Sequence, residues 1–250
     1  MATIIDGKII SSQIKDELRE KVAEYKEKGV EITLAVIQVG NDPASSVYVN
    51  NKKKACEYIG IKSLSYELAE ETTEEELLAI GKLAIKYDAF VVTDEVYEHM
   101  VYAPHKHTYM ASLPGMFEHT ITCNSLSKTF SITGWRLGYV VGTEEVIEAC
   151  KKVHDFLTVG AASPLQEAAV TGLNFPDSYY DELLELYTEK REYFCNGLDK
   201  LGIKYYKPQG TYFIMVDIQE FLDLPQFKGY SDLEFCEWMI RNIGLAAVPG

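Results

Sequence analysis

The segment 125–136 places a lysine, several hydroxyl side chains and an arginine close together in the chain. Its sequence is Ser-Leu-Ser-Lys-Thr-Phe-Ser-Ile-Thr-Gly-Trp-Arg, so Lys128 follows Ser125 and Ser127 and precedes Arg136 by eight residues. An uncharged lysine amine condenses with an aldehyde, and an arginine fork with nearby hydroxyl donors binds phosphate oxygens. The segment therefore predicts a site for a cofactor that carries both an aldehyde and a phosphate.

A second segment upstream supplies an acid and a phenol. Asp94 and Tyr97 lie three residues apart in Val-Val-Thr-Asp-Glu-Val-Tyr. The predicted cofactor is pyridoxal phosphate, whose ring nitrogen needs an acid to stay protonated and whose ring oxygen accepts a hydrogen bond. A serine–lysine turn or an isolated aspartate is most often structural, and it is the joint spacing that favours a cofactor site. The predicted catalytic and cofactor-binding residues here are Asp94, Tyr97, Ser125, Ser127, Lys128 and Arg136.

Two further motifs extend this pattern, namely Trp135-Arg136-Leu-Gly138-Tyr and Gln209-Gly-Thr-Tyr-Phe-Ile-Met-Val-Asp217. With them, residues 81–250 resemble the class I/II aminotransferases that depend on pyridoxal phosphate. The resemblance implies fold type I, an amino acid donor, a 2-oxo acid acceptor and a homodimer, and the last motif is similar to kynurenine, methionine and aspartate aminotransferases. Tyr212 and Phe213 in that motif are predicted core side chains.

The first eighty residues resemble a different enzyme, the bifunctional methylenetetrahydrofolate dehydrogenase/cyclohydrolase. The matching motifs include Ile5-Asp6-Gly7-Lys8 and the stretch from Tyr48 to Cys56. The resemblance implies that Tyr48 packs against a folate and that Lys52 takes part in proton transfer. Residues four apart share a helix face, although a lysine-rich, solvated helix face explains the same pattern. We thus expect an α/β chimera with a folate-enzyme segment at 1–80 and an aminotransferase segment at 81–250.

Parts of both families have no match in this chain. No folate-enzyme Gln-Leu-Pro-Leu-Pro segment, later catalytic aspartate or NADP-binding domain follows Ile80, and no aminotransferase phosphate loop precedes Asp94. The sequence also stops at Gly250 before the family's carboxylate-binding arginine. Impaired transamination by this chain is therefore expected. Two alternatives stay open: a non-catalytic fusion product, and residual folate binding through Tyr48 and Lys52.

Composition limits the classes of partner. The net charge of the 250 residues is −14, with −5 in residues 1–80 and −9 in the remainder, which argues against a nucleic-acid partner. Five scattered cysteines favour a cytoplasmic protein, and the lack of an apolar run of about 18 residues argues against a membrane span. Self-association is expected because each family segment lacks elements that cover its apolar surfaces in the parent enzyme, and the aminotransferase resemblance implies a homodimer. The histidines show no metal-binding spacing, so no metal is expected, and His105-Lys-His107 is predicted as an exposed loop.

Hydrophobic periodicity predicts alternating helices and strands, as in an α/β fold with ligand sites at the carboxyl ends of its strands. The strand at 33–39 is expected to be buried, and a turn is expected at 40–43. The predicted helices are 11–28, 44–59, 72–87, 144–157 and 177–201, and the predicted strands are 33–39, 62–68, 89–93, 120–123, 135–142 and two within 204–218.

Overall fold

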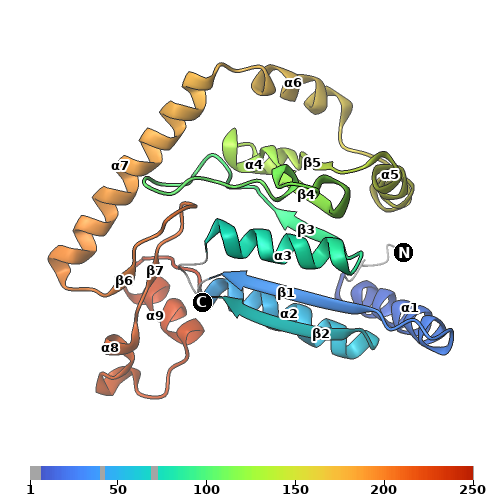
Figure 1. Ribbon diagram of the computed structural model, residues 1–250. Coiled ribbons are helices and arrows are strands. Elements are labelled where there is room, and N and C mark those ends of the chain that lie inside the picture. Colours follow the sequence, from blue (N-terminus) through green and yellow to red (C-terminus); the bar gives the residue numbers. More distant parts are fainter. Residues whose placement is uncertain (1–6, 40–42, 69–72, 250) are drawn as a thin grey trace, which may run out of the picture. The chain divides into compact units, whose positions relative to one another are not determined.

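The computed structural model describes residues 7–39, 43–68 and 73–249 (Figure 1). The chain forms an α/β structure that divides into two compact units, one made of Met1–Thr72 with Ile218–Gly250 and the other of Thr73–Asp217. The first unit contains α1 (Gly7–Glu27), β1 (Thr33–Val39), α2 (Pro43–Ile59), β2 (Lys62–Leu68), α8 (Gln219–Leu222), η4 (Pro225–Phe227) and α9 (Asp232–Asn242).

The second unit carries the remaining elements. They are α3 (Glu74–Lys86), β3 (Val91–Asp94), η1 (Met110–Ser112), η2 (Phe117–His119), β4 (Thr120–Ser125), α4 (Leu126–Thr129), η3 (Thr133–Trp135), β5 (Gly138–Val141), α5 (Glu144–Thr158), α6 (Ser163–Leu173), α7 (Asp177–Leu201), β6 (Tyr205–Tyr206) and β7 (Met215–Val216). Of these helices, the sequence patterns did not predict α4 and α6, and in the first unit they also missed α8 and α9.

The strands β1 and β2 form a parallel pair with the bounds that the sequence predicted. The preceding helix begins four residues earlier than expected. Of the turn predicted at 40–43, residues 40–42 lie outside the described residues, and Pro43 is the first residue of α2. The expectation that 33–39 is buried is wrong, since Leu34 is 39% and Ile37 44% exposed. A two-stranded sheet has no flanking strands, so both of its edges and part of its faces stay open to solvent.

A three-stranded sheet organises the second unit, with the order β3–β4–β5. The strands β3 and β4 are parallel, with Asp94 opposite Cys123, and β5 is antiparallel to β4. Parallel strands end at the same edge of a sheet, so Asp94 and Ser125 mark one edge. The strand predicted at 135–142 is shorter because residues 133–135 form a 3₁₀ turn and Arg136 has a left-handed φ of 55°, which a strand does not accommodate.

The helix α3 begins at a reciprocal capping box. The Glu76 backbone donates to the Thr73 hydroxyl, and the Glu76 carboxylate accepts from the Thr73 backbone. Its apolar face packs in a cluster with the 110–116 segment and β3. The buried members of this cluster are Ala84, Met110, Leu113 and Met116.

A second apolar cluster holds the short helix α4 that follows β4. Leu126 from α4, Leu137 and Ala169 from α6 are buried together, with Phe130 packed against them. The Tyr179 hydroxyl, at the start of α7, donates to the Thr129 carbonyl at 2.8 Å. Residues of both α6 and α7 therefore contact α4, the short helix that carries Lys128.

The close approach of β5 to β4 requires a glycine at position 138. A Cβ added to Gly138 would lie 2.7 Å from the Asn124 carbonyl oxygen, and backbone atoms there cannot move aside independently. Gly138→Ala is expected to lower the free energy of unfolding by about 1–3 kcal/mol, measured by urea titration. Gly134→Ala is the control, since nothing lies within 4 Å of its Cβ position. Equal free energies of unfolding for the two variants would show that the packing of β5 on β4 tolerates a Cβ at position 138.

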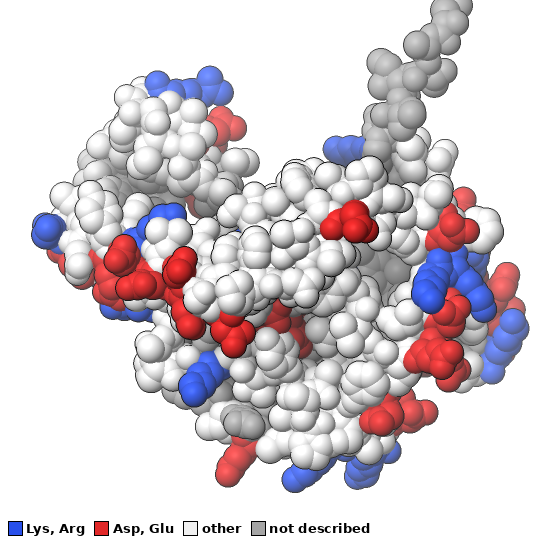
Figure 2. All heavy atoms as spheres, turned by 90° about the horizontal axis from the view of Figure 1, so that it is seen from above, with Lys and Arg blue, Asp and Glu red and all other residues white. Residues whose placement is uncertain are grey.

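Charged side chains are distributed in small groups. On the face drawn in Figure 2, lysines and arginines alternate with acidic residues and with broad uncharged areas.

Among the described helices, none is both long enough and apolar enough to cross a bilayer.

Candidate active site

The predicted site residues of the second unit lie where two parallel strands end. Asp94 is the last residue of β3, and Ser125 is the last residue of β4. Lys128 lies in α4, directly after β4, and Arg136 follows in the turn after η3. The Thr133 hydroxyl donates to the Ser127 carbonyl at 3.1 Å and so joins that turn to α4.

The Lys128 amine lies within an aromatic cluster. Its Nζ donates a hydrogen bond to the Tyr212 hydroxyl at 2.8 Å, and it lies 5.3 Å from the centre of the Tyr212 ring and 5.9 Å from that of Tyr97. The Tyr97 and Tyr212 rings meet edge to face at 5.4 Å. The expectation that Tyr212 and Phe213 are core residues is wrong, since they are 38% and 53% exposed. Aromatic character alone does not separate a core ring from one that lines a site.

The pKa values of Tyr97 and Tyr212 are shifted in opposite directions. Burial, followed by hydrogen bonding to Tyr212, raises the pKa of Tyr97 well above its usual value. Burial would also raise the pKa of Tyr212, but hydrogen bonds from Lys128 and Tyr97 and the Lys128 charge outweigh it and lower that pKa. The protonated Tyr97 is therefore the hydrogen-bond donor of this pair over a wide pH range.

Both predicted serine hydroxyls make contacts within the chain. Ser125 caps α4: its hydroxyl accepts from the Ser127 backbone at 3.2 Å and lies 2.7 Å from the Ser127 hydroxyl and 3.0 Å from the Leu137 carbonyl. Ser127 is buried. A phosphate bound here would compete with these contacts for the Ser125 hydroxyl proton.

Arg136 and Asp94 are both exposed and keep hydrogen-bonding capacity. Arg136 donates from Nη1 to the Thr133 carbonyl at 3.1 Å, and within the described part of the chain its other N–H groups have no recorded partner. The Asp94 carboxylate accepts one weak bond, from the Val96 backbone at 3.3 Å. One guanidinium edge and one carboxylate oxygen are thus available at the same sheet edge.

A buried polar network that the sequence patterns missed lies next to these residues. Glu95 is 5% exposed, and its carboxylate accepts from the Thr93 hydroxyl at 2.9 Å and lies 3.1 Å from His107 Nε2. The loop predicted at 105–107 is present with His105 and Lys106 exposed, but the expected exposure of His107 is wrong, because this contact draws its ring inward. Glu98 accepts from the Asn124 amide at 2.7 Å, and burial followed by the Glu98 charge raises the pKa of Tyr139 to about 12.

We expect Glu95→Ala to destabilise the second unit. The substitution leaves the Thr93 hydroxyl and the His107 ring without their buried acceptor, which costs about 1–3 kcal/mol. Urea unfolding measures the loss, and Glu95→Gln, which keeps one acceptor oxygen, should lose less. The control is the exposed Glu118→Ala, expected to change stability by less than about 0.5 kcal/mol. If Glu95→Ala has the same free energy of unfolding as the unaltered chain, the network does not stabilise the unit.

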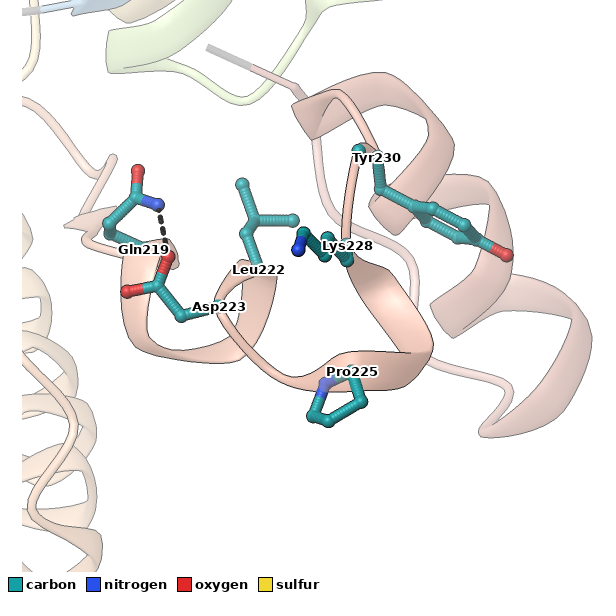
Figure 3. A pocket seen from close by; sticks show the side chains of 7 residues that line it. Gln219, Leu222, Asp223, Pro225, Lys228 and Tyr230 are labelled. Atoms are coloured by element: carbon teal, nitrogen blue, oxygen red, sulfur yellow. Dashed lines mark hydrogen bonds between the residues drawn. The ribbon is translucent and has the colours of Figure 1, made fainter.

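The predicted folate-contacting residues belong to the other unit. Tyr48 and Lys52 both lie in α2, and the Lys52 side chain is exposed. The same unit has a groove of about 570 Å³ beside α8 and η4, shown in Figure 3, where Gln219 donates to the Asp223 carboxylate at 2.9 Å. Its lining residues are Gln219, Leu222, Asp223, Pro225, Lys228, Gly229 and Tyr230.

The donor set of the second unit fits pyridoxal phosphate. An amine, a carboxylate, a phenol and a guanidinium come from the ends of two adjacent parallel strands and the turns that follow them. This is the edge at which open α/β sheets bind ligands. To bind it, the serine hydroxyls would exchange their present partners, and the Lys128 amine and the Tyr97 hydroxyl would leave Tyr212.

Comparison with known proteins gives two matches along the chain. Residues 51–250 match the family model for aminotransferase class I and II, and residues 5–86 match that for the tetrahydrofolate dehydrogenase/cyclohydrolase catalytic domain. Kynurenine–oxoglutarate transaminase 3 of Bos taurus is 36% identical over 211 residues, which cover 80% of this chain and 46% of that protein. Bifunctional protein FolD of Agathobacter rectalis is 78% identical over 80 residues, or 32% of this chain and 29% of that protein.

Solved structures agree on the fold. N-succinyldiaminopimelate aminotransferase from Mycobacterium tuberculosis aligns with a TM-score of 0.70 at 24% identity, covering 88% of this chain and 63% of that one. Bna3p, a putative kynurenine aminotransferase from Saccharomyces cerevisiae, gives the same score, identity and coverage. The chain thus spans about half of the curated transaminase that it matches and under two thirds of these two structures.

Proposed function

Because the chain belongs to the aminotransferase class I and II family, we propose that its second unit binds pyridoxal phosphate through Lys128 and transfers amino groups from an amino acid to a 2-oxo acid. The observation that carries the proposal is the position of Lys128 in the helix that follows β4, with its amine 5.9 Å from the centre of the Tyr97 ring, at the sheet edge where Asp94 ends β3. The chain spans about half of its transaminase relative. Reduced turnover is part of the proposal because no aminotransferase phosphate loop precedes Asp94.

Pyridoxal phosphate, when bound, supplies an aldehyde and a ring that withdraws electrons from the substrate carbon. The Lys128 amine is the nucleophile, and its Nζ is also the group that would move a proton at the substrate's α-carbon. Proton transfer by a positioned side chain contributes about 10²–10⁴-fold to rate.

Three further residues would hold the cofactor. The Asp94 carboxylate would accept a hydrogen bond from the protonated ring nitrogen, and the Tyr97 hydroxyl would donate to the ring oxygen. Arg136 would bind the phosphate with the N–H groups that its turn leaves available, as a planar guanidinium does well. Ser125 and Ser127 would add donors if the phosphate displaces their mutual hydrogen bond.

The covalent attachment point tests this function. The purified chain is incubated with pyridoxal phosphate, reduced with borohydride and digested, and the labelled peptides are identified by mass spectrometry. We expect the label on Lys128, and turnover with amino acids and 2-oxoglutarate measures whether catalysis follows. Label confined to other lysines would refute the assignment, and an unlabelled, inactive chain would favour a non-catalytic fusion product.

A second candidate function rests on the FolD-like segment. The identity of 78% over 80 residues and the placement of Tyr48 and Lys52 one turn apart on α2 support residual folate binding by the first unit. Thermal stabilisation by a folate, lost in Lys52→Ala, would support it. No shift in melting temperature at saturating folate would exclude it.

We place the boundary between the two family segments near residue 80. The folate-enzyme match ends at residue 86 and the aminotransferase match begins at residue 51, so residues 51–86 fall within both. The pieces on either side of this boundary can be expressed separately, and cooperative unfolding of 81–250 alone would support it. A cytoplasmic location for the whole chain likewise stays a proposal.

Self-association is the expected behaviour of the folded chain in solution. The helix α5 exposes apolar side chains near its end, where Phe156 is 92% and Leu157 73% exposed. Apolar surface of this kind favours association, in keeping with a homodimer. Light scattering should show dimers or larger species that Phe156→Asp weakens, whereas the exposed Lys152→Asp should not. A monomer at high concentration would contradict the prediction.

A further inference from the structure

We propose that Tyr212 positions the Lys128 amine for the amino-transfer reaction, an inference that rests on the function proposed above. The Tyr212 hydroxyl is the hydrogen-bond acceptor of Lys128 Nζ at 2.8 Å. Lysine has a flexible stem of four carbons, so without a partner its amine samples many positions. Small misplacements of a reacting group cost large factors in rate, which makes a partner at this atom consequential.

The backbone that carries Tyr212 is fixed by contacts to the segment after Tyr97. The Thr211 N–H donates to the Met100 carbonyl and the Tyr102 N–H donates to the Gln209 carbonyl, both at 2.8 Å. These two bonds form an isolated antiparallel bridge between Val101 and Gly210. The Tyr102 hydroxyl donates to the Thr211 carbonyl at 2.6 Å. Three hydrogen bonds thus join the Tyr212 loop to residues 100–102, which follow Tyr97 in the chain.

Thr211, directly before Tyr212, has a φ of +62°. A β-branched residue is strained in this region, and such strain persists only where surrounding contacts determine the backbone. The Thr211 hydroxyl accepts from the Phe213 N–H at 3.2 Å and so closes the turn around Tyr212. The turn therefore orients the Tyr212 ring, although the positive φ of Thr211 costs conformational free energy.

Two neighbouring rings restrict the Tyr212 side chain. Tyr187 from α7 stacks on it with a centroid separation of 6.0 Å and an interplanar angle of 24°, and Tyr97 meets it edge to face. The ring is held from two sides, and its hydroxyl points to Lys128. Within the described chain, the charged and titratable groups that act on this hydroxyl are Lys128 and Tyr97. Both lower the pKa of Tyr212, whereas burial raises it.

A titration without cofactor tests the pair itself. Tyrosine is labelled with ¹³C at the ring carbon that bears oxygen, and Tyr212→Phe identifies the Tyr212 signal among the 17 tyrosines. Removing the ammonium group should raise the pKa of Tyr212, so its midpoint should move to higher pH in Lys128→Met. The exposed Tyr206 serves as an internal control and should not move. The same Tyr212 midpoint in both proteins would overturn the inference.

Covalent capture tests the positioning. Tyr212→Phe keeps the ring and removes only the hydroxyl, and the loss of one hydrogen bond corresponds to about a three- to tenfold decrease in the borohydride-trapped label on Lys128. Tyr206→Phe should be labelled like the unaltered chain. Equal Lys128 label in Tyr212→Phe would overturn the role. If the unaltered chain takes no label at Lys128, the proposed function fails and this role with it, whereas the titration still shows whether the pair exists.

Discussion

Replacing Lys128 with alanine is expected to abolish covalent capture of pyridoxal phosphate in the second unit. Within the described chain, Lys128 is the only residue whose amine lies over the Tyr97 and Tyr212 rings, and the variant removes that amine. Any amino transfer should fall by about 10²–10⁴-fold, the contribution of a positioned proton-transfer group. Peptide mapping after borohydride reduction and a single-turnover assay measure the two effects.

Lys106→Ala is the matched control, because Lys106 is an exposed lysine of the same unit. It should keep both the Lys128 label and the rate of the unaltered chain. Retention of cofactor-dependent turnover by Lys128→Ala would show that another amine performs the reaction. Circular dichroism of the variant separates that result from unfolding.

Asp94→Asn is expected to lower turnover much more than labelling. The neutral amide cannot stabilise a protonated ring nitrogen as a carboxylate does, and a hydrogen bond to a charged group contributes about 1.5–3 kcal/mol, or roughly 10- to 150-fold in rate. Capture of an aldehyde by Lys128 does not require that charge, so the label should persist. Single-turnover rates and the labelled fraction, measured on the same preparation, provide the comparison.

The exposed Asp181→Asn on α7 controls for the loss of a negative charge from the unit. Its turnover and its labelling should match those of the unaltered chain. If Asp94→Asn keeps its full rate, Asp94 does not support the ring nitrogen. If it loses the label as well, Asp94 is required for capture of the cofactor itself and not only for the charge on the ring nitrogen.

Local sequence patterns were sufficient for most of the backbone. The bounds of α7 follow from apolar residues at helical spacing, and those of β1 follow from a nearly continuous apolar run. Gly29, Gly60 and Gly202 stand just after helices and have left-handed φ angles. These features depend on residues that are close along the chain. The resemblance of 81–250 to aminotransferases was confirmed by the family match, which also reaches back to residue 51.

The sequence also placed Asp94 and Lys128 at neighbouring strand ends. That prediction required only that both strands be parallel, because the carboxyl ends of parallel strands share an edge. The chemical roles given to Asp94, Tyr97, Ser125, Ser127, Lys128 and Arg136 stay predictions that the experiments above address.

By itself, then, the sequence determined the family, the α/β elements and the edge of the sheet that carries the candidate site. Only the tertiary structure decided which side chains meet there. Tyr212 lies 84 residues from Lys128 and was expected in the core, and the His107 ring was expected in solvent, yet the first binds the lysine and the second binds Glu95. Periodicity reports which face of an element is apolar, but the partner of a polar atom depends on how distant segments pack.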